Sequence, residues 1–370
     1  MNTRLVKVRA ADLDSEAGRK AIADAAAGIR AGGLVAFPTE TVYGLGANGL
    51  DEDAVARIFV AKGRPQDNPL ILHVAAPDEV RPLLKAVPAR AERLMARFWP
   101  GPLTLVLPRS PLVPDVVTGG LDTVAVRLPD HPVARALIAA AGVPIAAPSA
   151  NLSGRPSPTS ADHVLADLGG RVEMVIDGGR TTVGVESTVL DVTTNPPAIL
   201  RPGGVTREQL EEFLGAVAGP ESPAPGATPG AKASAGVPAA VERPRAPGMK
   251  YTHYSPAASL MLFIGPPDLV VRTINERAAA EGREGRRVGI LTVDEHLGAY
   301  QGGAATLLVS LGPADDGRAA ATNLFGCLRA FDIQGVDVIL AEGVDEAGIG
   351  LAVMNRLRKA ATRVITVDWG

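Results

Sequence analysis

A segment rich in proline and glycine divides this chain of 370 residues. Residues 219–247 contain seven prolines, four glycines and almost no large apolar side chain. Such a segment cannot bury enough apolar surface to offset the entropy lost on folding, so it predicts a linker. The chain length also favours two domains over one. We therefore expect one domain over 1–215, a linker over 216–256 and a second domain over 257–370.

Composition excludes several classes of protein. A hydrophobic fraction of 46% supports packed globular domains, and a net charge of -3 argues against a protein that coats a polyanion. The one cysteine, Cys327, excludes disulfides within the chain and cysteine-based zinc sites. No apolar run reaches about 18 residues, and the N-terminus lacks the apolar core of a signal peptide. We expect a cytoplasmic protein that does not associate with membranes.

Helix-like and strand-like segments alternate on both sides of the linker. Before it, helices are predicted over 21–30, 53–61 and 89–98, and strands over 34–37, 70–74, 103–107, 123–128, 143–147, 172–176, 187–192 and 198–201. Because some strands follow one another without a helix, this α/β domain should contain a mixed, twisted open sheet. After it, strands at 259–264, 287–291, 336–341 and 363–367 alternate with helices near 268–281, 315–331 and 350–361. That pattern predicts a smaller, Rossmann-like α/β domain.

Polar side chains follow the predicted strand 34–37 in the stretch "PTETVYGLGANG". The glycines match the dinucleotide-binding pattern G-x-G-x-x-G, but they do not directly follow the strand, and no acidic residue ends a second strand about 20 positions on. A glycine-rich turn with close backbone packing is the favoured interpretation. The hydroxyls and the carboxylate of "TETVY" stand where open α/β sheets bind ligands. A solvated turn is the alternative for that stretch.

Two cations precede a histidine-bearing strand in "AKGRPQDNPLILHV" (61–74). Lys62 and Arg64 could form a solvated helix end, which favours cations. The two prolines after them predict a rigid loop, however, and a rigid loop that presents a point charge and a planar guanidinium suits a polyphosphate. His73, taken alone, is more typical of a hydrogen-bonded core histidine than of a site residue.

A third polar stretch, "VPIAAPSANLSGRPSPT" (143–159), places many small hydrogen-bonding groups after an apolar strand. This pattern is typical of a phosphate or nucleotide site, with a polar surface loop as the alternative. The sequence lacks the P-loop, H-E-x-x-H, C-x-x-C and G-x-S-x-G motifs. The candidate groups therefore bind anions, and none of them is marked as a nucleophile.

The linker ends in an aromatic cluster, "APGMKYTHYSP" (246–256), which we call the lid segment. Two of the four tyrosines of the chain, Tyr251 and Tyr254, lie there. A plain tether would be small and polar at this point. The cluster predicts a segment that folds back and covers a site.

Together these stretches resemble the threonylcarbamoyl-AMP synthase family, which has a YrdC-like domain, in its longer two-domain form. The matching motifs also include "FWPGPLTLVL", "DTVAVRLP", "VESTVLD" and "LRPGGVT". The resemblance implies synthesis of L-threonylcarbamoyladenylate and pyrophosphate from L-threonine, bicarbonate and ATP, for threonylcarbamoyladenosine in tRNA. It also implies Mg²⁺ held mainly by ATP, no metal site on the protein, and transfer of the product to a downstream tRNA threonylcarbamoyl transferase complex.

The resemblance further implies roles for individual residues. Lys62 and Arg64 would act in catalysis. The ATP site would contain Lys62, Arg64, Gln66, Thr123, Ser149, Asn151, Ser157, Arg201 and Tyr251. L-Threonine would contact Thr39, His73, Arg127, Ala147 and Ser187, with Arg127 paired to its carboxylate.

Two other functions are alternatives to this synthase. A double-stranded RNA-binding or ribosome-associated module would use a basic cleft, and weak RNA binding could also accompany the synthase. Such a surface needs many dispersed cations, whereas these cations stand singly inside polar motifs. A carbamoyltransferase with a related domain is the second alternative. Those enzymes usually carry zinc-finger or kinase-like domains, which this sequence lacks.

Overall fold

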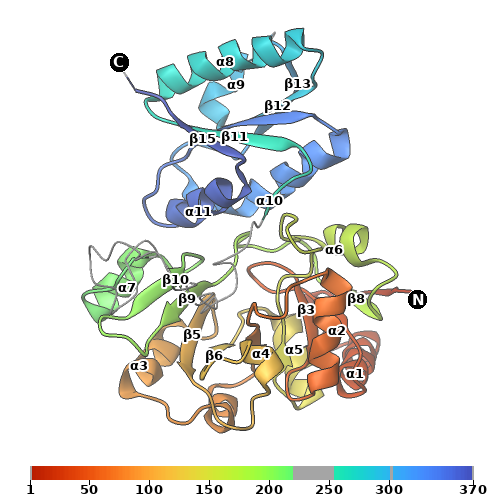
Figure 1. Cartoon of the computed structure of the whole chain (residues 1–370). Helices are drawn as coiled ribbons and strands as arrows, with labels where there is room; N and C mark the ends of the chain where they lie inside the picture. The colour runs from red at the N-terminus through yellow and green to blue at the C-terminus, as the bar shows by residue number, and fades with distance from the viewer. Residues whose placement is uncertain (1, 220–253, 301–302, 369–370) are drawn as a thin grey trace, which may run out of the picture.

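The computed structural model describes residues 2–219, 254–300 and 303–368 and contains two β-sheets (Figure 1). The first sheet has ten strands in the order β1-β8-β2-β3-β7-β4-β6-β5-β9-β10. Its strands are β1 Arg4–Lys7, β2 Val35–Phe37, β3 Gly44–Asn48, β4 Ile71–His73, β5 Leu103–Pro108, β6 Thr123–Arg127, β7 Ile145–Ala146, β8 Met174–Asp177, β9 Thr188–Asp191 and β10 Ala198–Arg201. The sheet contains parallel pairs, such as β4–β6, as well as antiparallel pairs, such as β2–β3, so the predicted mixed sheet is confirmed.

Helices cover both faces of this sheet. They are α1 Glu16–Arg30, α2 Glu52–Lys62, α3 Ala89–Phe98, α4 Asp115–Thr118, α5 Pro132–Ala141, α6 Ala161–Leu168 and α7 Arg207–Leu214, with 3₁₀ turns η1 Ala10–Asp12 and η2 Pro77–Leu83. Alanines and isoleucines of α1 pack with α5 on one face, and α2, α3 and α6 pack on the other. A core with few aromatic side chains therefore depends on small and branched aliphatic ones. Helices α5, α6 and α7 were not predicted.

The glycine-rich stretch after β2 forms strand β3, so the predicted turn is wrong. The predicted close packing is confirmed. A Cβ atom on Gly46 would lie 2.8 Å from Ile145 Cγ2 and 2.9 Å from Phe37, and one on Gly49 would lie 2.5 Å from Leu72 Cδ2. The glycines therefore serve the packing of a strand between its neighbours and do not form a phosphate-binding turn.

The second sheet has five strands, all parallel, in the order β13-β12-β14-β11-β15. They are β11 Ser259–Ile264, β12 Val288–Thr292, β13 Ala305–Ser310, β14 Val338–Glu342 and β15 Arg363–Thr366. The accompanying helices are α8 Pro267–Arg283, α9 Leu297–Tyr300, α10 Gly317–Gln334 and α11 Gly350–Ala360, with the 3₁₀ turn η3 Asp294–His296. The predicted second, Rossmann-like α/β domain is confirmed, and its sheet is parallel throughout the described strands. Strand β13, whose side chains are mostly only partly buried, was not predicted.

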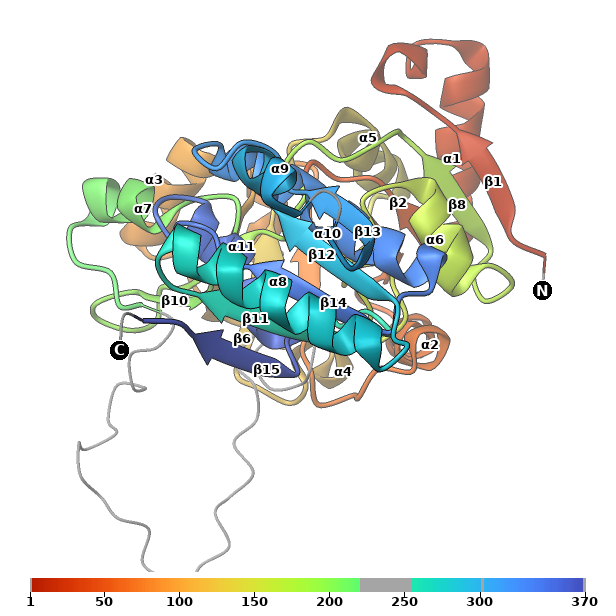
Figure 2. The same ribbon diagram turned by 90° about the horizontal axis from the view of Figure 1, so that it is seen from above.

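Helices α10 and α11 lie between the second sheet and the first domain, whereas α8 runs along the outer face (Figures 1 and 2). Two arginines on the inner helices reach acidic side chains of the first domain. Arg329 on α10 lies 2.8 Å from Asp167, and Arg356 on α11 lies 2.9 Å from Glu186. The two domains are therefore joined by buried ion pairs as well as by the chain itself. Within the described residues, no helix is long and apolar enough to cross a membrane.

Candidate active site

A pocket in the first domain gathers residues from most of the polar stretches. The space inside it, counted together with the open solvent at its mouth, is about 720 Å³. Ten of the predicted site residues line it: Thr39, Lys62, Arg64, His73, Arg127, Ala147, Ser149, Asn151, Ser187 and Arg201. The fold thus brings together residues that are far apart in the sequence.

Four of the predicted residues do not line the pocket in the described structure. Ser157 lies directly behind it, where its hydroxyl donates a 2.6 Å hydrogen bond to Glu186. Gln66 is exposed in the loop after α2, and Thr123 begins β6, at the opposite end of that strand from Arg127. Tyr251 and most of the lid segment lie outside the described residues.

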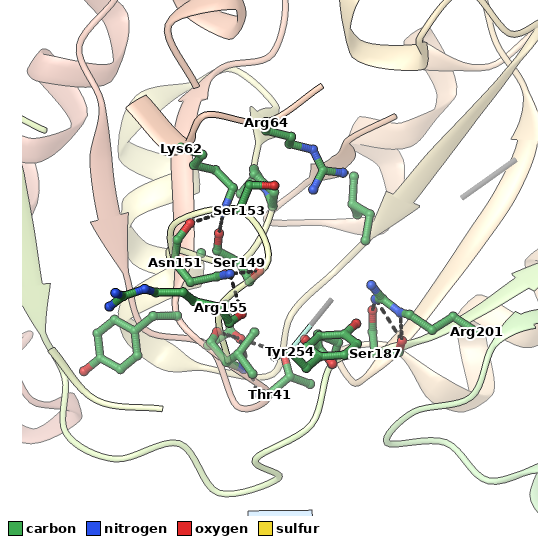
Figure 3. Close-up of a pocket in the computed structure, with 18 of the residues that line it drawn as sticks. Thr41, Lys62, Arg64, Ser149, Asn151, Ser153, Arg155, Ser187, Arg201 and Tyr254 are labelled. Atoms are coloured by element: carbon green, nitrogen blue, oxygen red, sulfur yellow. Dashed lines mark hydrogen bonds between the residues drawn. The ribbon is translucent and has the colours of Figure 1, made fainter. Parts of the chain in front are cut away.

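Lys62 is the last residue of α2 and is almost fully buried. Its ammonium donates hydrogen bonds to the backbone carbonyls of Ser149 and Asn151, which joins α2 to the polar loop after β7 (Figure 3). Burial lowers the pKa of Lys62 well below its usual value, and the charge of Arg64 lowers it further. An anion bound beside Lys62 would offset both effects, because it favours the charged ammonium.

Arg64 and Arg201 place guanidinium groups on different sides of the pocket (Figure 3). Gly63, in the left-handed conformation at φ 61°, ends α2 and turns the chain toward Arg64. Arg64 then donates to the carbonyls of Asn68 and Pro69, at 3.3 and 3.2 Å. Arg201, at the end of β10, donates to the carbonyl and the hydroxyl of Ser187. Each guanidinium is thereby held in place before any ligand binds.

Arg127 ends strand β6 and is buried in the pocket wall. Its guanidinium forms a 2.5 Å ion pair with Glu40 and donates to the hydroxyl of Thr41 at 3.0 Å. Thr41 in turn lies 2.8 Å from the hydroxyl of Thr39. The "PTET" turn therefore both orients Arg127 and contributes hydroxyls to the pocket.

His73 is paired with Arg127 in the register of β4 and β6. Burial lowers the pKa of His73 to about 3, and the neighbouring Arg127 charge contributes to that shift. One ring nitrogen, Nδ1, lies 3.2 Å from the Ile71 carbonyl oxygen. The imidazole is consequently neutral at physiological pH, and the cationic character of this wall comes from Arg127 alone.

Sequence reasoning missed Glu186 and placed Tyr254 only in the lid segment, although both line the pocket. Glu186 accepts hydrogen bonds from Ser157 and from Arg356 of the second domain. Burial raises its pKa, but the charges of Arg356 and Arg201 outweigh that effect and hold the pKa below its usual value. Tyr254 is buried and adopts a left-handed backbone with φ 68°. The sequence signals that could have located them are a glutamate before a buried strand and the aromatic cluster itself.

Five cationic side chains and one carboxylate line the pocket. The cations are Lys62, Arg64, Arg127, Arg155 and Arg201, and the carboxylate is Glu186. Among the residues that the structure describes, no group of three or more His, Cys, Asp and Glu side chains could hold a metal ion. Such a pocket can bind an extended polyanion and position it with charge-assisted hydrogen bonds.

Two family models match the chain. The Sua5/YciO/YrdC model, described as "Telomere recombination", matches residues 27–203. The model of the C-terminal domain of threonylcarbamoyl-AMP synthase matches residues 205–362. A threonylcarbamoyl-AMP synthase of Pyrococcus abyssi is 53% identical over 344 residues, which cover 93% of this chain and 95% of that protein. One from Bacillus subtilis is 49% identical over 341 residues, which cover 92% of each.

Solved structures agree with these relatives. The crystal structure of P. abyssi Sua5 complexed with L-threonine matches this structure with a TM-score of 0.87 at 51% identity. The match covers 99% of this chain and 100% of that one. A structure of a P. abyssi Sua5 variant with two alanine substitutions matches with a TM-score of 0.86, again at 51% identity, and covers 99% and 98% of the two chains. The similarity thus includes both sheets.

Proposed function

Because this chain belongs to the two-domain form of the Sua5/YrdC family of threonylcarbamoyl-AMP synthases, we propose that its pocket makes L-threonylcarbamoyladenylate and pyrophosphate from L-threonine, bicarbonate and ATP. The observation that carries this proposal is the pocket itself. It concentrates cations and hydroxyls, and Cys327 lies away from it on α10 of the second domain. In the proposed reaction a substrate supplies the nucleophile, so the pocket needs none of its own.

L-Threonine would occupy the wall formed by Thr39, His73, Arg127, Ala147 and Ser187. Arg127 would pair with the carboxylate, because a guanidinium matches a carboxylate in charge and geometry. The neutral His73 beside it would add no second positive charge next to the amine of threonine. This wall would hold the amine in its neutral, reactive form more readily than a wall with a second cation.

The reaction would proceed in two bond-forming steps. Bicarbonate takes up a proton and releases water to give carbon dioxide. The neutral amine of threonine attacks its carbon and forms a C–N bond while one C=O π bond opens onto oxygen, and the nitrogen releases one proton to solvent, which leaves a carbamate. A carbamate oxygen then attacks the α-phosphorus of ATP, and the bond from that phosphorus to the oxygen bridging to the β-phosphorus breaks. Pyrophosphate leaves with the bond's electron pair. The protein's contribution is to position the two substrates and to neutralise charge.

ATP would lie along the cationic side of the pocket. Lys62, Arg64 and Arg201 would contact the phosphates, and Ser149 and Asn151 would line the site beside them. Ser157, Gln66, Thr123 and Tyr251 complete the predicted ATP site. Since Glu40 and Glu186 are both engaged by arginines, Mg²⁺ would be held mainly by the triphosphate and water, where it would neutralise charge on the leaving pyrophosphate.

We assign the chemistry to residues 1–215 and propose residues 257–370 as a second domain that supports it, with 216–256 as the connection. The labile product would pass to a downstream tRNA threonylcarbamoyl transferase complex in the cytoplasm. The RNA-binding alternative gains no support, because the cations described above face the pocket of the enzyme rather than an extended surface.

Pyrophosphate release tests the proposed function directly. The full chain is incubated with ATP and Mg²⁺, and L-threonine and bicarbonate are each omitted in turn. We expect release only when both are present, together with an adenylate of the expected mass. Equal release without threonine would contradict the proposal, because the nucleophile would then come from another source.

A further inference from the structure

Arg356 occupies an unusual place on helix α11. The helix buries a face that contains Val353, Leu357 and Ala360, and Arg356 lies on that same face with its side chain fully buried. A cation on the apolar face of a helix is costly unless its charge is paired. The partner that pairs it, Glu186, belongs to the other domain.

The contacts of Arg356 converge on the pocket. Its Nε donates a 2.9 Å hydrogen bond to Oε2 of Glu186, and its Nη1 donates a 2.6 Å hydrogen bond to the carbonyl of Pro202. The guanidinium carbon lies 5.5 Å from the centre of the Tyr254 ring, within the range of a cation–π contact. Both Glu186 and Tyr254 line the pocket.

Glu186 connects Arg356 to the predicted ATP site through hydrogen bonds. One carboxylate oxygen accepts the hydrogen bond from Arg356, and the other accepts the 2.6 Å hydrogen bond from the Ser157 hydroxyl. The orientation of Glu186 therefore depends on a side chain from each domain. Tyr254 is also contacted from the second domain, because its ring packs against both Arg356 and Phe325 of α10, with the two ring centres 5.3 Å apart.

Stability alone does not account for this arrangement. Replacing a buried ion pair by well-packed apolar side chains is often neutral or stabilising. The pair lies at a pocket, however, and it fixes two lining side chains in orientations that an apolar pair would leave free. On the threonine wall, Ser187 has hydrogen bonds of its own with Thr104 and Arg201.

We propose that Arg356, in the second domain, is a positioning residue for the reaction. It fixes Glu186 and Tyr254 on the ATP side of the pocket, and through Glu186 it also fixes Ser157. This inference rests on the proposed function. It gives the second domain a specific task, namely to complete the nucleotide site with a buried guanidinium that the first domain lacks at this position.

The test compares Arg356→Met with Arg358→Met in the full chain. Arg358 is a matched control, because it lies on the same helix, is partly exposed and pairs with Glu346 of its own domain. We expect Arg356→Met to lower kcat/KM for ATP about 10- to 100-fold, the effect of a small misplacement of reacting groups. The KM for threonine should stay within about twofold of the wild type, and Arg358→Met should behave as the wild type.

Two further variants separate positioning from folding. Arg356→Lys keeps the charge but not the guanidinium geometry, so it should recover part of the ATP effect. The double variant with Glu186→Gln and Arg356→Met should have a turnover no lower than that of the more impaired single variant, because both substitutions remove the same contact. Thermal unfolding of each variant shows the folded fraction at the assay temperature, and if Arg356→Met does not fold, Arg356→Lys and Glu186→Gln carry the test.

The inference is overturned if folded Arg356→Met, or Arg356→Lys in its place, keeps the wild-type KM for ATP and kcat. It is equally overturned if the KM values for ATP and threonine rise together, which indicates a general structural role. Failure of the proposed function is a different result. In that case the wild type itself releases no pyrophosphate that depends on threonine, while the comparison of ATP binding between Arg356→Met and Arg358→Met still reports on positioning.

Discussion

Two buried arginine–glutamate pairs lie beside the same pocket, Arg127 with Glu40 and Arg356 with Glu186. In both pairs the side chains are at most 7% exposed, and each brings a guanidinium within 2.9 Å of a carboxylate oxygen. The first pair lies within one domain and joins residues 87 positions apart. The second crosses between the domains and joins residues 170 positions apart.

The two pairs differ in what the sequence reveals about them. Glu40 and Arg127 both stand in polar stretches at strand ends, so their stretches could be singled out before the fold was known. Glu186 lies in such a stretch as well, but Arg356 lies in a helix whose sequence carries no site motif. The sequence motifs of one domain therefore do not delimit a site to which a second domain contributes.

The largest effect is expected when the first pair is broken. Arg127→Met removes the predicted partner of the threonine carboxylate and leaves Glu40 buried without its cation. Breaking a buried pair in this way costs about 3–5 kcal/mol of unfolding free energy. Losing the charge-assisted contact should also lower kcat/KM for threonine by roughly 10- to 150-fold. Urea unfolding and steady-state kinetics measure the two effects separately.

Adding Glu40→Gln sharpens this result. The double variant has no buried carboxylate left unpaired, so most of the lost stability should return. Activity with threonine should remain low, because the guanidinium is still absent. If activity also returns, Arg127 serves only to balance Glu40, and its role in threonine binding is wrong.

Next in size are Lys62→Ala and Arg64→Ala. Each should lower turnover by roughly 10- to 150-fold, the effect of losing one charge-assisted contact of about 1.5–3 kcal/mol. Arg57→Ala is the control, since Arg57 lies on α2, as Lys62 does, and pairs with Glu173 outside the pocket. Circular dichroism should show folded protein in all three variants. Kinetics like those of the control would mean that neither side chain contributes to ATP turnover.

A smaller effect is expected from His73 on stability in acid. Its pKa is about 3 in the folded protein against 6.5 for an ordinary histidine. Between these values the unfolded chain binds a proton that the folded protein does not, so the free energy of unfolding falls as the pH falls. From about pH 7.5 to pH 5 the loss should be roughly 2 kcal/mol.

His73→Gln isolates this contribution. Burial also lowers the pKa of His131 and of His163, the latter to about 4, but both remain in the variant. The acid-induced loss of unfolding free energy should therefore be smaller in His73→Gln than in the wild type by the stated amount. Identical pH dependence in urea titrations would mean that His73 is not buried in its neutral form.

The smallest effect is predicted for Cys327→Ser. Burial raises the pKa of this thiol to about 11, so it stays protonated, and it lies on α10 of the second domain. Because substrate supplies the nucleophile, pyrophosphate release should be unchanged. A folded variant without activity would show that the second domain contributes chemistry as well as position.

Much of the fold could be predicted from local patterns. Helix α3 and strand β10 have the predicted bounds, and a proline precedes each of them. Strand β3 was mistaken for a turn, since its glycines have low strand propensity on their own. Only its neighbours explain it: Ile145 and Phe37 leave no space for a Cβ atom at Gly46.

The two α/β domains and the linker could be predicted from strand periodicity and composition, which are local properties of the chain. The family and the ten predicted residues that line the pocket came from the resemblance of its motifs to a known family. The partner of each buried cation is known only from the tertiary structure: Lys62 donates to the loop carbonyls, Arg127 pairs with Glu40, and Arg356 pairs with Glu186. A buried charge is stable only beside a partner, and these partners lie 87 or more positions away in the sequence, where no local pattern indicates them.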